Sequence, residues 1–308
     1  MLEYFLTVIQ QIFSMFLMVV VGFVMFKLKM ISESGTKELS TLLLKIVTPM
    51  ILVSSFQRQF EVELLLRWLI MFGASALTYF VHIALAELLY AKEDGVRAES
   101  KLSVVLPNNG FLAFPLLQAL AGEFGIFFGS ASVIILNILM WTYGTKQMRP
   151  NEKMSARKII SNPGVISIVL GLILFCSPWK LPAPVYSAVS AIGSLNTPVA
   201  MIVLGAMLAQ TDLKKALVQM DYYKLSLIKL IIAPIIMMAV FIFLPIPDDV
   251  KLVAFVCSVT PTATAVSMLS QIYDRNYRYS TNAVVITTVL SAITMPVVLT
   301  IGKIVLGY

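Results

Sequence analysis

Two short polar stretches interrupt an otherwise apolar chain, and their residue types could bind a small ligand. Pro107–Gly110 reads Pro-Asn-Asn-Gly and is followed by Pro115, while Thr260–Thr264 reads Thr-Pro-Thr-Ala-Thr. A proline removes a backbone donor and clashes with the carbonyl four residues earlier, so each stretch predicts a broken helix. Unpaired backbone groups are costly in lipid, and we therefore expect both breaks to line a cavity or to pack on protein.

The side chains at these breaks suit a carboxylate ligand. Asn108 and Asn109 offer neutral amide donors beside Gly110, and Thr262 and Thr264 offer hydroxyls. The amino end of a broken helix adds free N–H groups and partial positive charge. Such a site could hold an organic anion without any buried basic residue.

Composition places most of the chain in a lipid bilayer. Of 308 residues, 59% are hydrophobic and 13% are charged, against about 45–50% and about 25% in soluble domains, and the mean hydropathy is +0.90. At about 20 residues per membrane helix, the apolar residues would fill about nine or ten spans. The predicted spans cover about 5–26, 39–56, 64–90, 102–120, 124–145, 159–177, 185–209, 225–245, 252–272 and 280–306.

The basic residues predict the orientation of these spans. The loops after odd-numbered spans hold 16 of the 23 Lys and Arg residues, and the opposite side holds 5. This asymmetry predicts a multi-pass protein of the cell membrane with both termini outside. The net charge of +7 is then a topology signal, and we expect no nucleic-acid partner. The central cytoplasmic loop would carry Lys146, Arg149, Lys153, Arg157 and Lys158.

Prolines recur at a near-constant offset and indicate an internal repeat. The Thr-Pro pairs that end at Pro49 and Pro198 are 149 residues apart, and Pro107 and Pro261 are 154 residues apart. Each half would hold five helices, and five is odd, so the second half would enter the membrane from the opposite side.

The predicted fold class is an all-α membrane protein. It has ten transmembrane helices arranged as two inverted five-helix repeats, 1–147 and 158–308, in which broken helices 4 and 9 cross. The two cysteines, Cys176 and Cys257, lie in apolar runs and offer neither a disulfide framework nor a metal cluster.

The fourth span also carries a resemblance to a known family. Leu106–Leu117, Leu-Pro-Asn-Asn-Gly-Phe-Leu-Ala-Phe-Pro-Leu-Leu, resembles the fourth span of the auxin efflux carrier family, which joins plant auxin exporters to bacterial malate and malonate permeases. Three further stretches are similar to the family: Ser161–Gly164, Thr197–Gly205 and Val259–Ala263. The resemblance extends over the whole chain.

The resemblance implies a secondary active transporter of small organic anions of the malate or malonate kind. It implies a scaffold of spans 1, 2, 6 and 7, with helix breaks at Pro49 and Pro198, and a transport domain of spans 3–5 and 8–10. It also implies a homodimer through the scaffold and elevator-type alternating access. The family's crossover prolines map to Pro107 and Pro261, and its substrate-binding asparagine maps to Asn108.

Two departures from the plant members bear on the substrate. About a dozen residues replace their large central loop. The sixth span opens with Gly164-Val165, where the plant pattern has a second asparagine and an aromatic residue. The second difference argues against auxin as the natural ligand.

The coupling ion is left open between Na⁺ and H⁺, and no other cofactor is expected. His82, the only histidine, lies inside span 3 and suits proton coupling, although a neutral imidazole bonded to a neighbouring helix is the alternative. No Asp or Glu lies in the middle of a span, which weakens a carboxylate-based ion site. A sodium site could use backbone carbonyls with Asn109, Thr262, Thr264 and Gln271.

Three charged residues near the cytoplasmic ends of spans have a simpler interpretation. Lys45 and Lys229 are expected to extend to the interface, with attraction of an anion as the alternative. Glu87 is expected to reach the interface as well.

Other functions fit the chain less well. A membrane receptor that binds a carboxylate without transporting it, a sodium-coupled carrier of a larger organic anion and a channel remain alternatives. An enzyme is not expected, because Gly-x-Ser-x-Gly, His-Glu-x-x-His and paired intramembrane aspartates are missing from the sequence.

Overall fold

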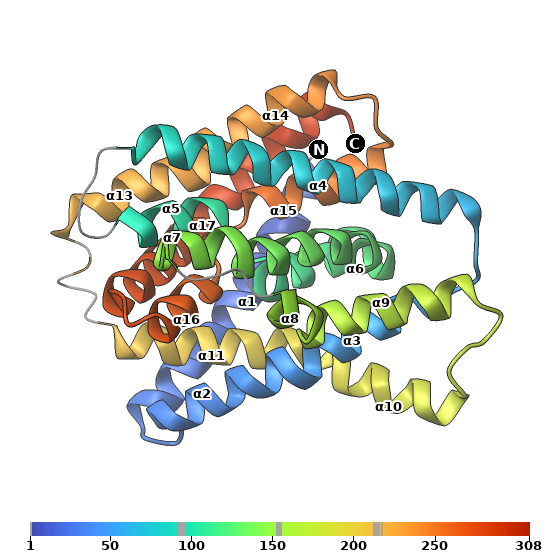
Figure 1. Ribbon diagram of the computed structural model, residues 1–308, viewed down its shortest axis with the longest axis horizontal. Helices are drawn as coiled ribbons and strands as arrows, with labels where there is room; N and C mark the ends of the chain where they lie inside the picture. The colour runs from blue at the N-terminus through green and yellow to red at the C-terminus, as the bar shows by residue number, and fades with distance from the viewer. Residues whose placement is uncertain (1, 92–96, 152–155, 212–215, 217) are drawn as a thin grey trace.

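The protein is an all-helical molecule in the computed structural model, which describes residues 2–91, 97–151, 156–211, 216 and 218–308 (Figure 1). Over these ranges the only β pairing is one isolated antiparallel bridge, between Pro107 and Thr262. The predicted all-α class is therefore confirmed. Lys153 of the predicted central loop lies outside the described residues.

The helices follow the predicted apolar stretches closely, with π-helical turns (η) inside several of them. Their bounds are α1 Leu2–Lys27, α2 Glu33–Leu42, η1 Leu43–Val47, α3 Thr48–Ser55, α4 Val62–Leu89, α5 Arg97–Val105, η2 Asn109–Ala113, α6 Phe114–Leu139, η3 Met140–Gly144, α7 Thr145–Met148, α8 Ala156–Ile160, α9 Pro163–Cys176, α10 Ala183–Ser194, α11 Asn196–Gln210, α13 Met220–Leu227, η4 Ile228–Ile232, α14 Ala233–Phe243, α15 Asp248–Val259, α16 Thr264–Ile272 and α17 Tyr277–Leu306.

The molecule is built to lie in a membrane. Within the described residues, seven helical stretches are long and apolar enough to cross one. Their outward faces are apolar too, as Phe80, Phe243 and Ile293 are exposed. In water such a surface would be strongly unfavourable, whereas lipid solvates it. The seven stretches are 2–27, 33–55, 62–89, 109–148, 183–210, 220–243 and 277–306.

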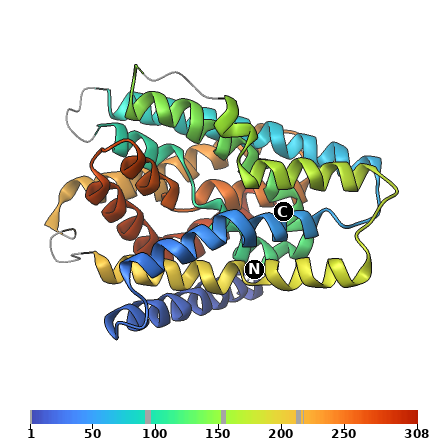
Figure 2. The ribbon, with the colours of Figure 1, turned by 60° about the horizontal axis from the view of Figure 1, so that its bottom comes forward.

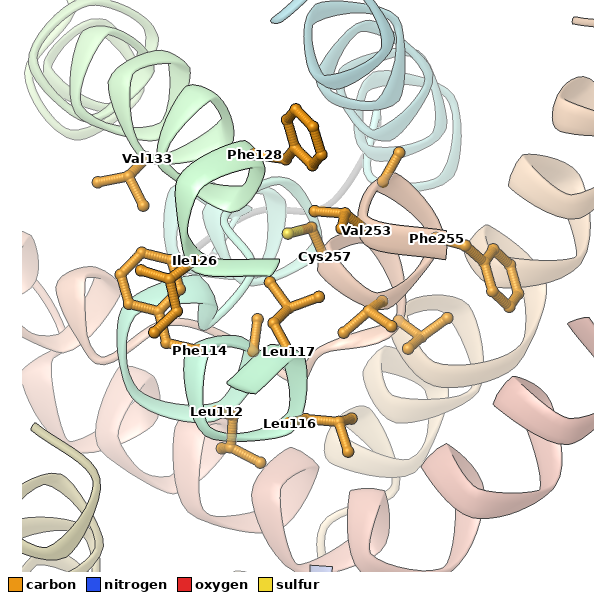
Figure 3. Packing of buried hydrophobic residues seen from close by; sticks show 14 of the residues in the cluster. Leu112, Phe114, Leu116, Leu117, Ile126, Phe128, Val133, Val253, Phe255 and Cys257 are labelled. Carbon is orange, nitrogen blue, oxygen red and sulfur yellow. The ribbon is translucent and has the colours of Figure 1, made fainter. Parts of the chain in front are cut away.

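Helix α6 consists of two helical segments that meet at Gly122. This residue has φ +59° and ψ −145°, a left-handed backbone that glycine adopts without steric cost. The segments then pack face to face, because a Cβ placed on Gly125 or Gly129 would meet Leu117 of the preceding segment. Figure 3 shows Leu117 lying close to Cys257 of α15. The reversal falls between the predicted fourth and fifth spans.

Two groups of helices can be distinguished by their packing. Helix α1 packs chiefly on α11, and α3 packs on α9 and α10. Helices α4, α6, α14 and α15 pack on one another, and α17 packs on α13–α16 and also on α1. Figures 1 and 2 show α2, α3, α10 and α11 gathered along one side of the molecule, away from α4 and α14.

The prolines predicted to break helices have different outcomes. At Pro49 the chain stays helical, because the π turn Leu43–Val47 directly before α3 accommodates a residue without an N–H donor. Pro198 lies in the first turn of α11, just after the helix is interrupted at Leu195, where backbone donors are free in any case. Pro115 likewise lies in the first turn of α6 and causes no break. The helix-break predictions at Pro49 and Pro115 are therefore wrong.

Candidate functional site

Two helix breaks meet in the interior and pair through their backbones. Helix α5 ends at Val105 and α15 ends at Val259. The backbone N–H of Asn108 donates to the Pro261 carbonyl at 2.8 Å, and the backbone N–H of Ala263 donates to the Leu106 carbonyl at 2.9 Å. Each break thus satisfies backbone groups of the other, which permits irregular backbone deep inside an apolar protein.

Side chains that are distant in sequence donate hydrogen bonds to the carbonyls at the carboxyl end of α5. An intact helix would bond the Ser103 carbonyl to the amide of residue 107, but Pro107 has none. The Thr262 hydroxyl donates to that carbonyl instead, at 2.9 Å. The next carbonyl, of Val104, accepts from the Lys229 ammonium at 2.8 Å, because the backbone N–H of Asn108 donates to Pro261 instead. Two residues distant in sequence therefore replace two lost helix hydrogen bonds.

A cavity of about 1460 Å³ reaches the first of these breaks. The α2–α3 segment and α11 line one side, and the 107–111 segment, α16 and the start of α17 line the other. Six of the predicted site residues lie on its wall: Pro107, Asn108, Asn109, Gly110, Thr264 and Gln271.

The two adjacent asparagines are held differently. The Asn109 amide donates to the Ser132 hydroxyl at 2.8 Å, and its carbonyl oxygen accepts from Thr260 at 3.2 Å. Asn108 is also buried, but its Nδ2 makes no hydrogen bond. A buried amide donor without a partner is unfavourable by about 1–3 kcal/mol, so an acceptor brought within reach of Nδ2 would stabilise it.

Several predicted residues lie away from the cavity wall. Thr262 is fully buried, and its hydroxyl is used on the Ser103 carbonyl, so the structure does not bring it to the cavity as a ligand donor. Pro261 and His82 lie behind the wall. The proposed set of sodium ligands is therefore not gathered at one point, because Gln271 is exposed at the far end of α16.

Asn196 links the two groups of helices and could not be identified as a site residue from its type alone. Its amide donates to the Gly110 carbonyl at 3.0 Å, and its oxygen accepts from the Thr48 hydroxyl at 3.0 Å. The Leu-Asn-Thr-Pro sequence carried the signal, because Asn196 directly precedes the second Thr-Pro pair. Both Thr-Pro pairs thus lie next to the 107–110 break.

Lys229 does not extend to the interface, so that prediction is wrong. Its side chain is fully buried, since the carbonyl end of α5 accepts its ammonium. Lys45 is exposed and lines the cavity. Glu87 accepts hydrogen bonds from Tyr143 and Gln147, both at 2.8 Å, and pairs with buried Lys101.

The two ends of the cavity region differ in charge and closure. Four basic residues lie on the wall, namely Lys37, Lys45, Lys158 and Arg278. At the opposite end Arg58 approaches Glu123, with Nη2 to Oε2 3.9 Å, and lies 4.3 Å over the Phe124 ring. Burial lowers the pKa of the Arg58 guanidinium, and the Glu123 carboxylate opposes that shift.

The described residues contain no group of three or more His, Cys, Asp or Glu side chains that could hold a metal ion. The polar groups around the break are amides, hydroxyls and carbonyls. They can bind and orient an anion, and they include neither a nucleophile–base pair nor a general acid in contact with Asn108.

Comparison with known proteins identifies the family to which the chain belongs. The profile of a family described as "Membrane transport protein" matches residues 7–299, nearly the whole sequence. No curated protein matches the chain. The resemblance to the auxin efflux carriers, carried by the Leu106–Leu117 segment, is thus confirmed over the chain as a whole. The protein belongs to the membrane transport protein family, that of the auxin efflux carriers and their relatives.

Proposed function

We propose that this membrane transporter is a secondary carrier of small organic anions of the malate or malonate kind. One observation carries the proposal: Asn108 lies on the wall of a large cavity at a helix break, and its buried side-chain Nδ2 has no hydrogen-bond partner. Neutral amide donors suit a carboxylate, and basic residues near the cavity mouth would attract one. Thr264 lies on the same wall and adds a hydroxyl.

We further propose that the chain crosses the membrane ten times as two inverted five-helix repeats. The reversal at Gly122 divides 109–148 between a fourth and a fifth crossing, α9 supplies the sixth, and α15 with α16 supplies the ninth. An even number of crossings is supported by residues near the two ends of the described chain. The ring centroids of Tyr4 and Tyr308 lie 6.5 Å apart, so both residues lie on the same side of the membrane in this arrangement. Seven crossings would separate the termini by the membrane thickness.

Alternating access by an elevator motion is the mechanism we propose. The scaffold would be α1–α3 and α9–α11, the helices that pack on one another beside the cavity, and the transport domain would be the remainder. The two breaks would move with the anion as one unit, because they are bonded together. A homodimer through the scaffold would keep that part fixed in the bilayer.

The test separates the two adjacent asparagines. Purified protein in liposomes is assayed for uptake of labelled malonate and malate, with malate loaded inside for exchange. Asn108→Ala should reduce uptake at least tenfold with little change in melting temperature, because its amide has no partner to lose. Asn109→Ala should lower the melting temperature, since it removes bonds to Ser132 and Thr260. Asn151→Ala, in an exposed loop, is the matched control.

Unchanged uptake by folded Asn108→Ala protein would refute the proposed site. Ligand-induced stabilisation of the wild-type protein without any exchange would instead support a non-transporting receptor.

A further inference from the structure

We propose that the Lys229 ammonium is a built-in cation that occupies, at the broken end of α5, the place where other carriers bind a coupling sodium ion. Broken helices in transporters expose carbonyl oxygens, and these oxygens coordinate Na⁺. In this protein the Val104 carbonyl accepts from Lys229 Nζ at 2.8 Å. The inference rests on the proposed function for its effect on transport, but the cation site can be tested without any substrate.

The carboxyl end of α5 is a suitable place for a cation. Its last carbonyls carry the partial negative charge of the helix dipole, and a positive charge within the last turn is stabilised. The Ser103 and Leu106 carbonyls are taken by Thr262 and by the Ala263 amide. The Val104 carbonyl between them is the one that accepts an ammonium group.

Lys229 is held differently from the other buried lysine. Lys101 pairs with the Glu87 carboxylate, so its charge is neutralised locally. Among the described residues no carboxylate lies within 4.0 Å of Lys229, although its side chain is fully buried. An ammonium ion buried without a counter-ion is strongly unfavourable unless fixed dipoles compensate it. The carbonyl end of α5 provides such dipoles, and a bound anion would provide the missing charge.

His82 faces the same place and supplies no negative charge. It is fully buried beside the Val105 carbonyl. The broken end of α5 therefore faces an ammonium and an imidazole. Since the backbone turns from Val104 to Asn108 within four residues, Lys229 would act on the anion through the position of this break. It is a positioning residue and does not line the cavity.

The first experiment measures the cation site directly. The melting temperature of the purified protein is compared in NaCl, LiCl and KCl at equal ionic strength. The wild-type protein should show no shift specific to Na⁺ or Li⁺, because Lys229 fills the site. Lys229→Ser should melt lower in KCl and recover part of the loss in NaCl or LiCl, since the vacated Val104 carbonyl can then coordinate a small ion. Lys224→Ser, on the same helical stretch, is the matched control.

The second experiment measures transport in liposomes. Wild-type uptake of malonate should be equal in sodium and choline buffers. Lys229→Met, which keeps the length and removes the charge, should raise KM at least tenfold with a smaller change in kcat, and Lys229→Arg should restore most of the affinity. If Lys229 only filled space, Lys229→Met should have a KM closer to the wild-type value than Lys229→Arg.

Three results would overturn the inference: Na⁺-specific stabilisation of the wild-type protein, sodium-dependent wild-type uptake, or folded Lys229→Ser protein that ignores Na⁺ and Li⁺. Should that variant not fold, the wild-type comparison of salts and the methionine variant decide the matter. Gain of Na⁺ stabilisation by Lys229→Ser beside unchanged uptake in Asn108→Ala would keep the cation site and refute the proposed transport site.

Discussion

Neighbouring residues in the first helix break have opposite roles. Asn109 is fixed by Ser132 and Thr260, whereas the side-chain Nδ2 of Asn108 has no hydrogen-bond partner. Both are buried and both are amides, so residue type does not distinguish them. The difference comes from the partners Ser132 and Thr260, which only Asn109 has. The proposed binding site therefore depends on one side chain, that of Asn108.

Asn196 should matter for both stability and turnover. Asn196→Ala would leave the Gly110 carbonyl and the Thr48 hydroxyl without this partner. We expect a loss of about 1–3 kcal/mol in the free energy of unfolding and a changed kcat, because the bond joins the two groups of helices. Denaturant unfolding and exchange assays would measure both, with Ser194→Ala as control. Wild-type values in both assays would contradict the assigned link.

The sequence predicted where the two helices break but not which partners the side chains around the breaks have. Prolines at 107 and 261 marked both breaks, because a missing donor is a local property of the chain. The use of Thr262 depends on a carbonyl 159 residues away, and that of Lys229 on one 125 residues away. Neither pairing leaves a local pattern, so Thr262 was taken for a ligand and Lys229 for an interfacial residue.

At the scale of helices, glycine permits a close backbone contact between α1 and α11. Helices α1 and α11 approach so closely that a Cβ on Gly205 would meet the backbone of Val19 and Phe23. A Cβ on Gly22 would likewise meet the backbone of Ile202. Small residues allow this kind of backbone contact, which replaces the hydrophobic driving force that lipid removes.

Gly205→Ala should therefore destabilise the protein. The added methyl group has to separate two helix backbones, and we expect a loss of about 1–3 kcal/mol, as for other overpacked sites. Gly73→Ala is the matched control, because a Cβ there meets nothing within 4 Å. Melting temperatures of the two variants decide the point, and equal values would show that the α1–α11 contact adjusts freely.

The helices themselves were largely predictable, because runs of apolar residues leave few alternatives in lipid. The π turns were not. Proline at 49 predicted a break, yet one wider turn at Leu43–Val47 keeps the chain helical. Such a turn depends on the packing of η1 against α9 and α10, which no local sequence pattern reveals.

At the scale of the whole molecule, the charged residues of the cavity wall define a direction. The cavity wall includes four basic residues, while the Arg58 guanidinium lies over the Phe124 ring away from that wall. If the basic loops are cytoplasmic, as their charge predicts, the basic residues of the wall lie toward the cytoplasm.

The native cysteines allow this orientation to be measured. Cys176 is exposed at the end of α9 away from the basic loops, and Cys257 is buried. A membrane-impermeant maleimide should label wild-type protein in intact spheroplasts and should not label Cys176→Ser. Labelling that occurs only in inverted vesicles would place the termini in the cytoplasm.

The manner in which α5 ends also has a consequence for biogenesis. Its terminal carbonyls are paired by groups from Lys229, Thr262 and Ala263, all in the second half of the chain. When the ribosome has delivered only the first half, these carbonyls have no such partners. We therefore expect the first half to lie in the membrane with these carbonyls unpaired by protein groups. The break at Asn108 would reach its final structure only after residue 263 has been inserted.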